Sequence, residues 1–283
     1  MGHRAAIVTG GLRGLGRAMA LGLARTGVRV LAVGHIDTDI PEMQALAASN
    51  GSADAIACLA ADIRDPAECD RVVAACIDRF GAADILVNNA GLTFTTIAPD
   101  RFRRTTRQKF WEVSDEIIQA VVATNYVAAD QMTRRLAPLM VERGWGRIVN
   151  VTTKLSTMNM LGAMPYGASK AALEMATEVW AKELAGTGVT VNIVNPGAGA
   201  NTPGMAQEMR DRSAAGTVPR LVEPEEMVSP LLFVVSRAAD RINGYRFDAN
   251  TWDTSLPPSD AARKEGRQAG FELHTQDREP WPT

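Results

Sequence analysis

Short apolar segments alternate with longer segments of helical periodicity along most of this chain. The apolar segments are 5–10, 28–34, 54–62, 83–91, 146–152, 189–197 and 245–250. Helical patterns cover 16–27, 66–81 and 114–144, with Ser114 at the N-cap position of the last. Short, wholly apolar strands separated by helices form parallel sheets covered on both faces. The sequence therefore predicts a single-domain α/β fold, a Rossmann-like doubly wound parallel sheet with helices on both faces.

Two segments do not follow this alternation. Residues 92–109 carry five basic side chains within a short stretch: Arg101, Arg103, Arg104, Arg107 and Lys109. Residues 253–283 are polar and contain four prolines. Such composition favours an arm or partly disordered segment over a domain. We therefore expect a domain over 1–252 and a C-terminal extension or arm over 253–283.

Composition excludes several classes of protein. The formal net charge is −2, which argues against binding to nucleic acid or to an anionic membrane. No run reaches the roughly 18 apolar residues of a membrane span, and the first residues contain no long apolar targeting region. The three cysteines, Cys58, Cys69 and Cys76, lack the spacing of metal ligands. We expect a cytoplasmic protein with free thiols, and no metal, membrane or nucleic-acid partner.

A glycine-rich turn, TGGLRGLG (9–16), joins the first predicted strand to the first helix. Gly10, Gly14 and Gly16 let the backbone turn tightly, so that a pyrophosphate can approach the helix N-terminus. That terminus offers free N–H donors and the positive end of the helix dipole. The turn predicts dinucleotide binding, although many strand-to-helix turns contain glycine and the motif alone is weak.

The spacing Thr-Gly-x-x-x-Gly-x-Gly resembles that of the short-chain dehydrogenase/reductase family. Three further motifs match the family in order: NNAG (88–91), YGASK (166–170) and NPG (195–197). The resemblance covers about residues 4–252, which it identifies as a dinucleotide-binding and catalytic domain. It implies an NAD or NADP cofactor and a homo-oligomer, a dimer or tetramer, assembled through helices near 114–144 and 166–185.

The resemblance also implies which residues contact the cofactor, because each lies at or next to a cofactor-binding position of the family. These are Gly10, Leu12, Arg13, Gly14, Leu15, Gly16, Gly34, His35, Asp62, Ile63, Asn89, Ala90, Gly91, Tyr166, Lys170, Pro196, Gly197, Gly199 and Thr202. Thr202 lies one residue after the usual family position, which Asn201 occupies.

The residues after the second strand favour NADP over NAD. An acidic residue there normally binds the ribose 2′-hydroxyl of NAD, but this chain has Gly34 and then His35. Arg13 lies where a guanidinium can bind a 2′-phosphate. NAD stays possible, because a small shift of register would bring Asp37 to the ribose.

Tyr166 and Lys170 stand four residues apart, which places both on one face of a helix. A free phenol has a pKa of about 10. A nearby ammonium favours the phenolate and would lower that pKa towards neutrality. The resemblance makes Tyr166 the acid/base of the reaction and gives Lys170 a second role in holding the nicotinamide ribose.

Two further positions complete the expected catalytic group. The family's serine, thirteen residues before the tyrosine, is replaced by Thr153, whose hydroxyl can donate the same hydrogen bond. Ser156 is a rival hydroxyl, and a loop donor is a third option. Asn125 matches the family's helix asparagine, which supports a proton relay; a purely structural role for a buried asparagine is the alternative.

These residues together predict an NAD(P)-dependent oxidoreductase that interconverts a secondary alcohol and a ketone or other carbonyl compound. A catalytically weak, dinucleotide-sensing binding protein on the same fold is the alternative. A sugar epimerase or dehydratase is disfavoured by the glycine spacing and the short substrate region. Apolar residues expected near the substrate are Met158, Met160, Leu161, Met164, Met205 and Met209. The basic segment 101–109 either attracts an anionic substrate or is a solvated or subunit-contacting insertion.

Overall fold

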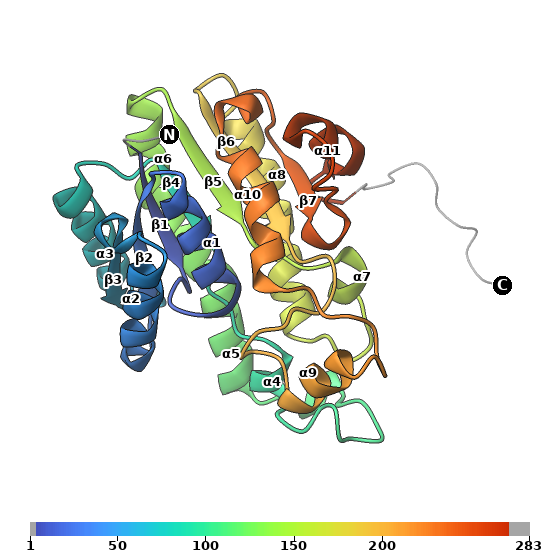
Figure 1. The fold of residues 1–283 in the computed structure, drawn as a ribbon. Coiled ribbons are helices and arrows are strands. Elements are labelled where there is room, and N and C mark those ends of the chain that lie inside the picture. The colour runs from blue at the N-terminus through green and yellow to red at the C-terminus, as the bar shows by residue number, and fades with distance from the viewer. Residues whose placement is uncertain (1–3, 272–283) are drawn as a thin grey trace.

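A single sheet of eight strands forms the centre of the computed structural model, which describes residues 4–271 (Figure 1). The strand order is β3-β2-β1-β4-β5-β6-β7-β8. All neighbours pair in parallel except β7 and β8, which are antiparallel. The strands are β1 (Ala5–Thr9), β2 (Arg29–Gly34), β3 (Ile56–Ala60), β4 (Ile85–Asn88), β5 (Gly146–Asn150), β6 (Val189–Asn195), β7 (Tyr245–Asp248) and β8 (Arg267–Gln268).

Helices cover both faces of this sheet. One face carries α1 (Gly14–Arg25), α2 (Ile40–Ser49), α10 (Val228–Val234) and α11 (Pro258–Glu265). The other carries α3 (Pro66–Phe80), α6 (Ala128–Glu142) and α8 (Tyr166–Glu183). Shorter helices are α4 (Phe94–Ile97), α5 (Asp115–Val122), α7 (Leu155–Met158) and α9 (Gln207–Ala214). The predicted doubly wound α/β fold is confirmed.

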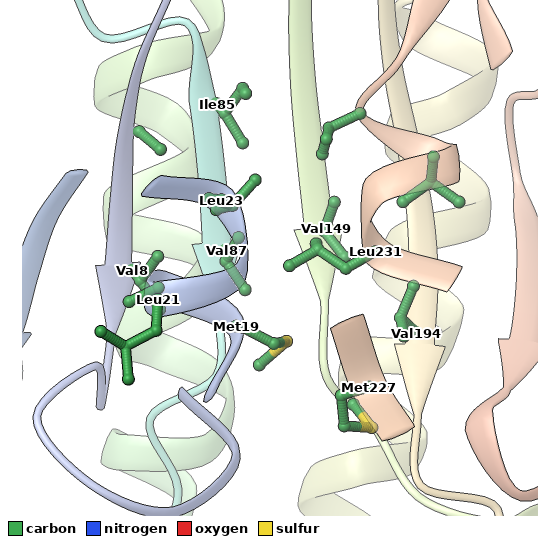
Figure 2. Packing of buried hydrophobic residues seen from close by; sticks show 14 of the residues in the cluster. Val8, Met19, Leu21, Leu23, Ile85, Val87, Val149, Val194, Met227 and Leu231 are labelled. Carbon is green, nitrogen blue, oxygen red and sulfur yellow. The ribbon is translucent and has the colours of Figure 1, made fainter. Parts of the chain in front are cut away.

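Alternation along each strand divides the core into two layers. Val8 and Val87 point towards α1 and α10, whereas Ile7 points to the opposite face. Figure 2 shows Met19 of α1 near Val87 of β4, and Leu231 of α10 beside Val149 of β5. Each such side chain contributes about 1.5–3 kcal/mol when it is fully buried. Strands that are apolar on both sides can be stable only between two layers of helices.

The chain reverses its direction of travel across the sheet at β1. The strands β2 and β3 lie on one side of it, and β4 to β7 lie on the other. In open parallel sheets, ligands bind beyond the carboxyl ends of the strands at such a switch point. Figure 1 shows α4, α5 and α9 gathered at that end of the sheet, where the functional motifs also lie.

The described part of the 253–283 segment is packed on the domain. Helix α11 buries Ala261 and Ala262 in the core, and β8 adds an edge strand to β7. Up to residue 271 this segment is therefore an integral extension of the sheet and not a free arm. Residues 272–283, the rest of the predicted arm, lie outside the described residues. Between residues 4 and 271, no helix is both long and apolar enough to cross a membrane.

Candidate active site

Three adjoining hollows follow the carboxyl ends of the strands and form one cleft. Gly10 and Ala90 line both of the hollows beside the glycine turn, and Asn89 and Gly91 connect that region to the third. The third hollow has a volume of about 570 Å³ and contains Tyr166. Every predicted cofactor contact except Gly16 lines this cleft.

The glycine turn is held by close contacts between backbone segments. Gly10 and Gly14 have positive φ angles of 63° and 56°, which glycine adopts without strain. A Cβ atom on Gly16 would lie 2.1 Å from the carbonyl oxygen of Gly10, so α1 can begin this close to the turn only with glycine there. The side chain of Asn89 donates to the carbonyl oxygens of Thr9 (2.9 Å) and Gly10 (3.1 Å).

The N-terminus of α1 faces this part of the cleft and carries no acidic residue in its first turn. The free N–H groups of that turn and the helix dipole favour a phosphate group. The residues present therefore fit the diphosphate of a dinucleotide.

The second hollow lies between the ends of β2 and β3. Gly34, His35, Asp62 and Ile63 line it, and all four are residues that the sequence predicts as cofactor contacts. Arg64, which was not predicted, also lines it and donates from Nε to Asp62 at 2.9 Å. This hydrogen bond is the largest cause of the lowered pKa of Asp62.

Asp39, and not Asp37, is the acidic residue that lines the first hollow beside Arg13. Asp39 ends a 3₁₀ turn, Asp37–Asp39, and its carboxylate lies 3.6 Å from Nε of Arg13. Asp39 and Arg13 both line the first hollow, and Asp37 does not. Sequence reasoning missed Asp39 because the turn after β2 decides which acidic residue faces the cleft. A carboxylate such as that of Asp39 favours the ribose hydroxyl of NAD, and a guanidinium such as that of Arg13 favours the 2′-phosphate of NADP. The two side chains therefore act in opposite directions on the choice of cofactor.

Tyr166 is the first residue of α8 and Lys170 follows one turn later, as the spacing predicts. Thr153, in the loop after β5, hydrogen-bonds to the Tyr166 side chain. Ser156, the rival hydroxyl, lies on α7 and also lines the cleft, but it is exposed. Thr153 is therefore the hydroxyl that the fold brings to the tyrosine.

The expected lowering of the Tyr166 pKa is wrong for the chain by itself. Burial raises the pKa of the phenol, and the hydrogen bond to Thr153 acts in the opposite direction. Burial also lowers the pKa of Lys170 to about 8. Lys170 is 4% exposed, and its Nζ donates to the carbonyl oxygen of Val151 at 2.7 Å. Desolvation thus dominates over attraction between the two groups.

Asn125 lies in a π-helical turn, Ala123–Val127, between α5 and α6. The predicted helix over 114–144 is therefore interrupted, although Ser114 caps its start as expected. The buried Asn125 side chain accepts from the N–H of Leu92 at 2.7 Å and donates to its carbonyl oxygen at 3.1 Å. It also donates to Oγ of Ser169 at 3.0 Å. The side chain thus holds the loop after β4 against α8, and π turns are frequent at functional sites.

A buried ion network lies behind Thr153 and was not predicted. Arg246 on β7 donates to Glu174 on α8 at 2.7 Å and to the carbonyl oxygen of Thr153 at 3.0 Å. The hydroxyl of Thr152 donates to Glu174 at 2.9 Å. Arg246 is 1% exposed and Glu174 is 0% exposed. The network ties the loop after β5 to the helix that carries Tyr166.

The loop after β6 closes the far side of the cleft. Pro196, Gly197 and Gly199 line it, and so does Thr202. Asn201, which occupies the usual family position, instead donates to the carboxylate of Glu223 at 3.0 Å. Thr202 is therefore the side chain of this loop that faces the cleft.

The wall beyond Tyr166 is formed by the segment after β4 and by two methionines. Met160 and Met205 line this hollow, whereas the other expected apolar residues do not: Met158, Leu161, Met164 and Met209. The ring of Phe94 lies 4.6 Å from that of Tyr166, centroid to centroid. Arg101 and Arg107, from the basic segment, also line the hollow.

The sequence and the fold of this chain are similar to those of known proteins. A family model described as short chain dehydrogenase matches residues 4–213. A 3-oxoacyl-(acyl-carrier-protein) reductase from Synechocystis sp. is 34% identical over 87% of this chain and 94% of its own length. An acetoacetyl-CoA reductase from Allochromatium vinosum is 30% identical over 87% and 97%, respectively. A variant of actinorhodin polyketide ketoreductase, solved with NADPH, has a TM-score of 0.72 and 29% identity, over 85% of this chain and 93% of that one.

Proposed function

This chain belongs to the short-chain dehydrogenase family, and from that membership we propose that it interconverts a secondary alcohol and a ketone with a nicotinamide dinucleotide. One observation carries the proposal: Thr153, Tyr166 and Lys170 meet in the same hollow, which opens onto the glycine turn. A hydroxyl pair and an ammonium at the end of a dinucleotide cleft suit proton exchange with an alcohol oxygen.

Each catalytic side chain has a distinct role in this proposal. Tyr166 donates its phenolic proton to the carbonyl oxygen during reduction and takes it back during oxidation. Thr153 hydrogen-bonds to that oxygen and helps to place it next to the phenol. Lys170, with a pKa of about 8, exchanges a proton near neutral pH and stabilises negative charge on the phenol. Asn125 positions the loop after β4 and α8 for this relay.

The residues of the cleft fit a nicotinamide dinucleotide, which when bound supplies or accepts the hydride. The glycine turn would hold the diphosphate, and Asp62 and Ile63 the adenosine. The segment Pro196–Gly197 and Thr202 would lie against the nicotinamide end. Arg13 favours NADP over NAD through its charge, while Asp39 at 3.6 Å limits that preference.

A Tyr166→Phe variant tests the proposal. It keeps the ring that packs on Phe94 but removes the proton that the carbonyl oxygen would receive. We expect kcat for ketone reduction to fall by roughly 10²–10⁴-fold, with little change in NADPH affinity measured by fluorescence. Turnover close to that of the wild type would contradict the role of Tyr166. Parallel assays of the wild type with NADH and NADPH, compared by kcat/KM, test the cofactor preference.

A further inference from the structure

The hollow beside Tyr166 has an uneven charge. Within residues 4–271 it is lined by four basic residues and by no Asp or Glu; the basic residues are Arg101, Arg107, Lys154 and Lys170. Lys170 donates to a backbone carbonyl. Arg101 and Arg107 line only this hollow and not the two beside the glycine turn. Their charges therefore attract an anion that is separate from the diphosphate of the cofactor.

Arg101 lies close to the catalytic tyrosine. Its guanidinium is 4.1 Å from the centroid of the Phe94 ring, and that ring stacks at a tilt on Tyr166. Its Nη1 donates to the carbonyl oxygen of Gly162 at 2.7 Å, in the loop that leads into α8. The guanidinium and the phenol ring thus both contact the ring of Phe94.

One nitrogen of this guanidinium is left without a partner. Nη2 of Arg101 is buried and makes no hydrogen bond within the described residues. A buried N–H group that gives up its hydrogen bonds to water without gaining another partner destabilises the folded chain. Burial and the nearby charge of Arg107 both lower the pKa of Arg101. An anion bound beside the two arginines would offset the repulsion between their charges.

The other arginines of the segment differ from Arg101. Arg104 forms an ion pair with Asp100 at 2.8 Å, and both side chains are largely solvated. Arg103 is exposed and does not line the hollow. Arg107 lines the hollow too, but its side chain is exposed. Arg101 is therefore the member of the segment that combines a place in the hollow with a buried donor left without a partner.

We propose that the substrate is a short anionic ketone, or the corresponding alcohol, and that Arg101 binds its carboxylate or phosphate while Tyr166 faces the carbonyl oxygen. The inference rests on the proposed function and adds the substrate class to it. Because Arg101 and Tyr166 both contact Phe94, the anionic group and the reacting carbonyl would belong to one small molecule. A guanidinium forms charge-assisted hydrogen bonds to the oxygens of either anion.

Matched substrate pairs test the proposal with the full chain and saturating NADPH. Levulinate is compared with methyl levulinate, and dihydroxyacetone phosphate with dihydroxyacetone. We expect kcat/KM of the wild type to be at least tenfold higher for the anionic member of one pair. The pair that shows this preference distinguishes a carboxylate from a phosphate.

Arg101→Met and Arg103→Met each remove one positive charge. Comparing them distinguishes direct binding by Arg101 from a general effect of positive charge near the hollow. Arg101→Met keeps an apolar stem over Phe94 and should raise KM for the preferred anion at least tenfold, which corresponds to about 1.4 kcal/mol. KM for its neutral partner should change by less than about twofold. The control, Arg103→Met, should leave both values within about twofold. Arg101→Lys should lie between the wild type and Arg101→Met, and thermal unfolding verifies that each variant is folded.

The outcomes distinguish this inference from the proposed function. Equal kcat/KM for both members of each pair, with turnover intact, overturns the inference and leaves the function standing. If no ketone is reduced, calorimetric titration of NADP⁺-saturated protein decides the inference separately, because no hydride is then available. Tighter binding of levulinate or dihydroxyacetone phosphate to the wild type than to Arg101→Met supports it, and equal or absent binding overturns it.

Discussion

The two walls of the cleft are built on different physical principles. The glycine wall, residues 9–16, is shaped by backbone approach, as the 2.1 Å from a Cβ on Gly16 to the Gly10 oxygen illustrates. The catalytic wall consists of the loop after β5 and the start of α8. It is held by buried charge, with Arg246 bonded to Glu174 and to the Thr153 carbonyl. Steric closeness is insensitive to pH and salt, whereas buried ionisable groups titrate.

The difference between the two walls corresponds to their proposed tasks, which are cofactor binding and proton transfer. A diphosphate needs N–H groups and room, which glycine supplies without any side chain. A proton transfer needs hydroxyl and ammonium groups at fixed positions, and these must be removed from water. The catalytic wall therefore depends on buried charges, which need partners and respond to pH, whereas the glycine wall does not. The following changes test this dependence.

The largest effect is expected from Arg246→Met. The variant leaves Glu174 buried without its cationic partner and the Thr153 carbonyl without its donor. Removing one member of a buried ion pair typically costs about 3–5 kcal/mol. We expect a loss of that size in the free energy of unfolding, measured with urea, and a lower kcat in the fraction that folds because Thr153 is less well placed.

The control for this variant is Arg263→Met, which removes an exposed ion pair with Asp260 at 3.0 Å. Exposed pairs contribute about 1 kcal/mol or less, so this variant should unfold nearly as the wild type does. An equally small loss in Arg246→Met would show that the buried network does not support the catalytic wall.

The next effect concerns the pH dependence of stability through Lys170. Its pKa is about 8 in the folded chain and 10.5 in the reference state, so between these values the unfolded chain holds more protons. Stability from this group therefore rises with pH across that window, and its penalty is fully present below pH 8. The shift corresponds to about 3 kcal/mol.

Comparison with Lys170→Met isolates this contribution. The free energy of unfolding of the wild type, minus that of the variant, should increase by about 3 kcal/mol between pH 7.5 and pH 10.5. The variant also loses the hydrogen bond to Val151, which adds a constant to the difference in the free energy of unfolding but leaves its dependence on pH unchanged. A difference that is flat over this window would mean that Lys170 is not desolvated in the folded chain.

Features encoded within a few neighbouring residues could be predicted from the sequence. The apolar strands, the glycine turn and the one-turn spacing of Tyr166 and Lys170 all depend on local pattern, and the structure places them as expected.

Features that depend on distant segments could not be predicted. The partners Arg246 and Glu174 lie 72 residues apart, and no local pattern relates them. The π turn at Asn125 has no signature in its own residues. The sign of the Tyr166 pKa shift was missed because burial depends on the packed cleft, which spacing along a helix does not reveal.

The smallest expected effect, and the sharpest test of the difference between the walls, comes from Gly16→Ala. The added methyl group would lie 2.1 Å from the Gly10 oxygen and 2.4 Å from Nδ2 of Asn89, so the turn must shift, at a cost of about 1–3 kcal/mol in stability. Gly22→Ala, in the same helix, would clash at 2.5 Å with the side chain of Val228, far from the turn. Both variants should lose stability, but NADPH titration should show at least a tenfold weaker Kd only for Gly16→Ala. Because the cause is steric, that ratio should be the same at pH 6.5 and at pH 9; a ratio that follows pH would assign the glycine wall to electrostatics as well.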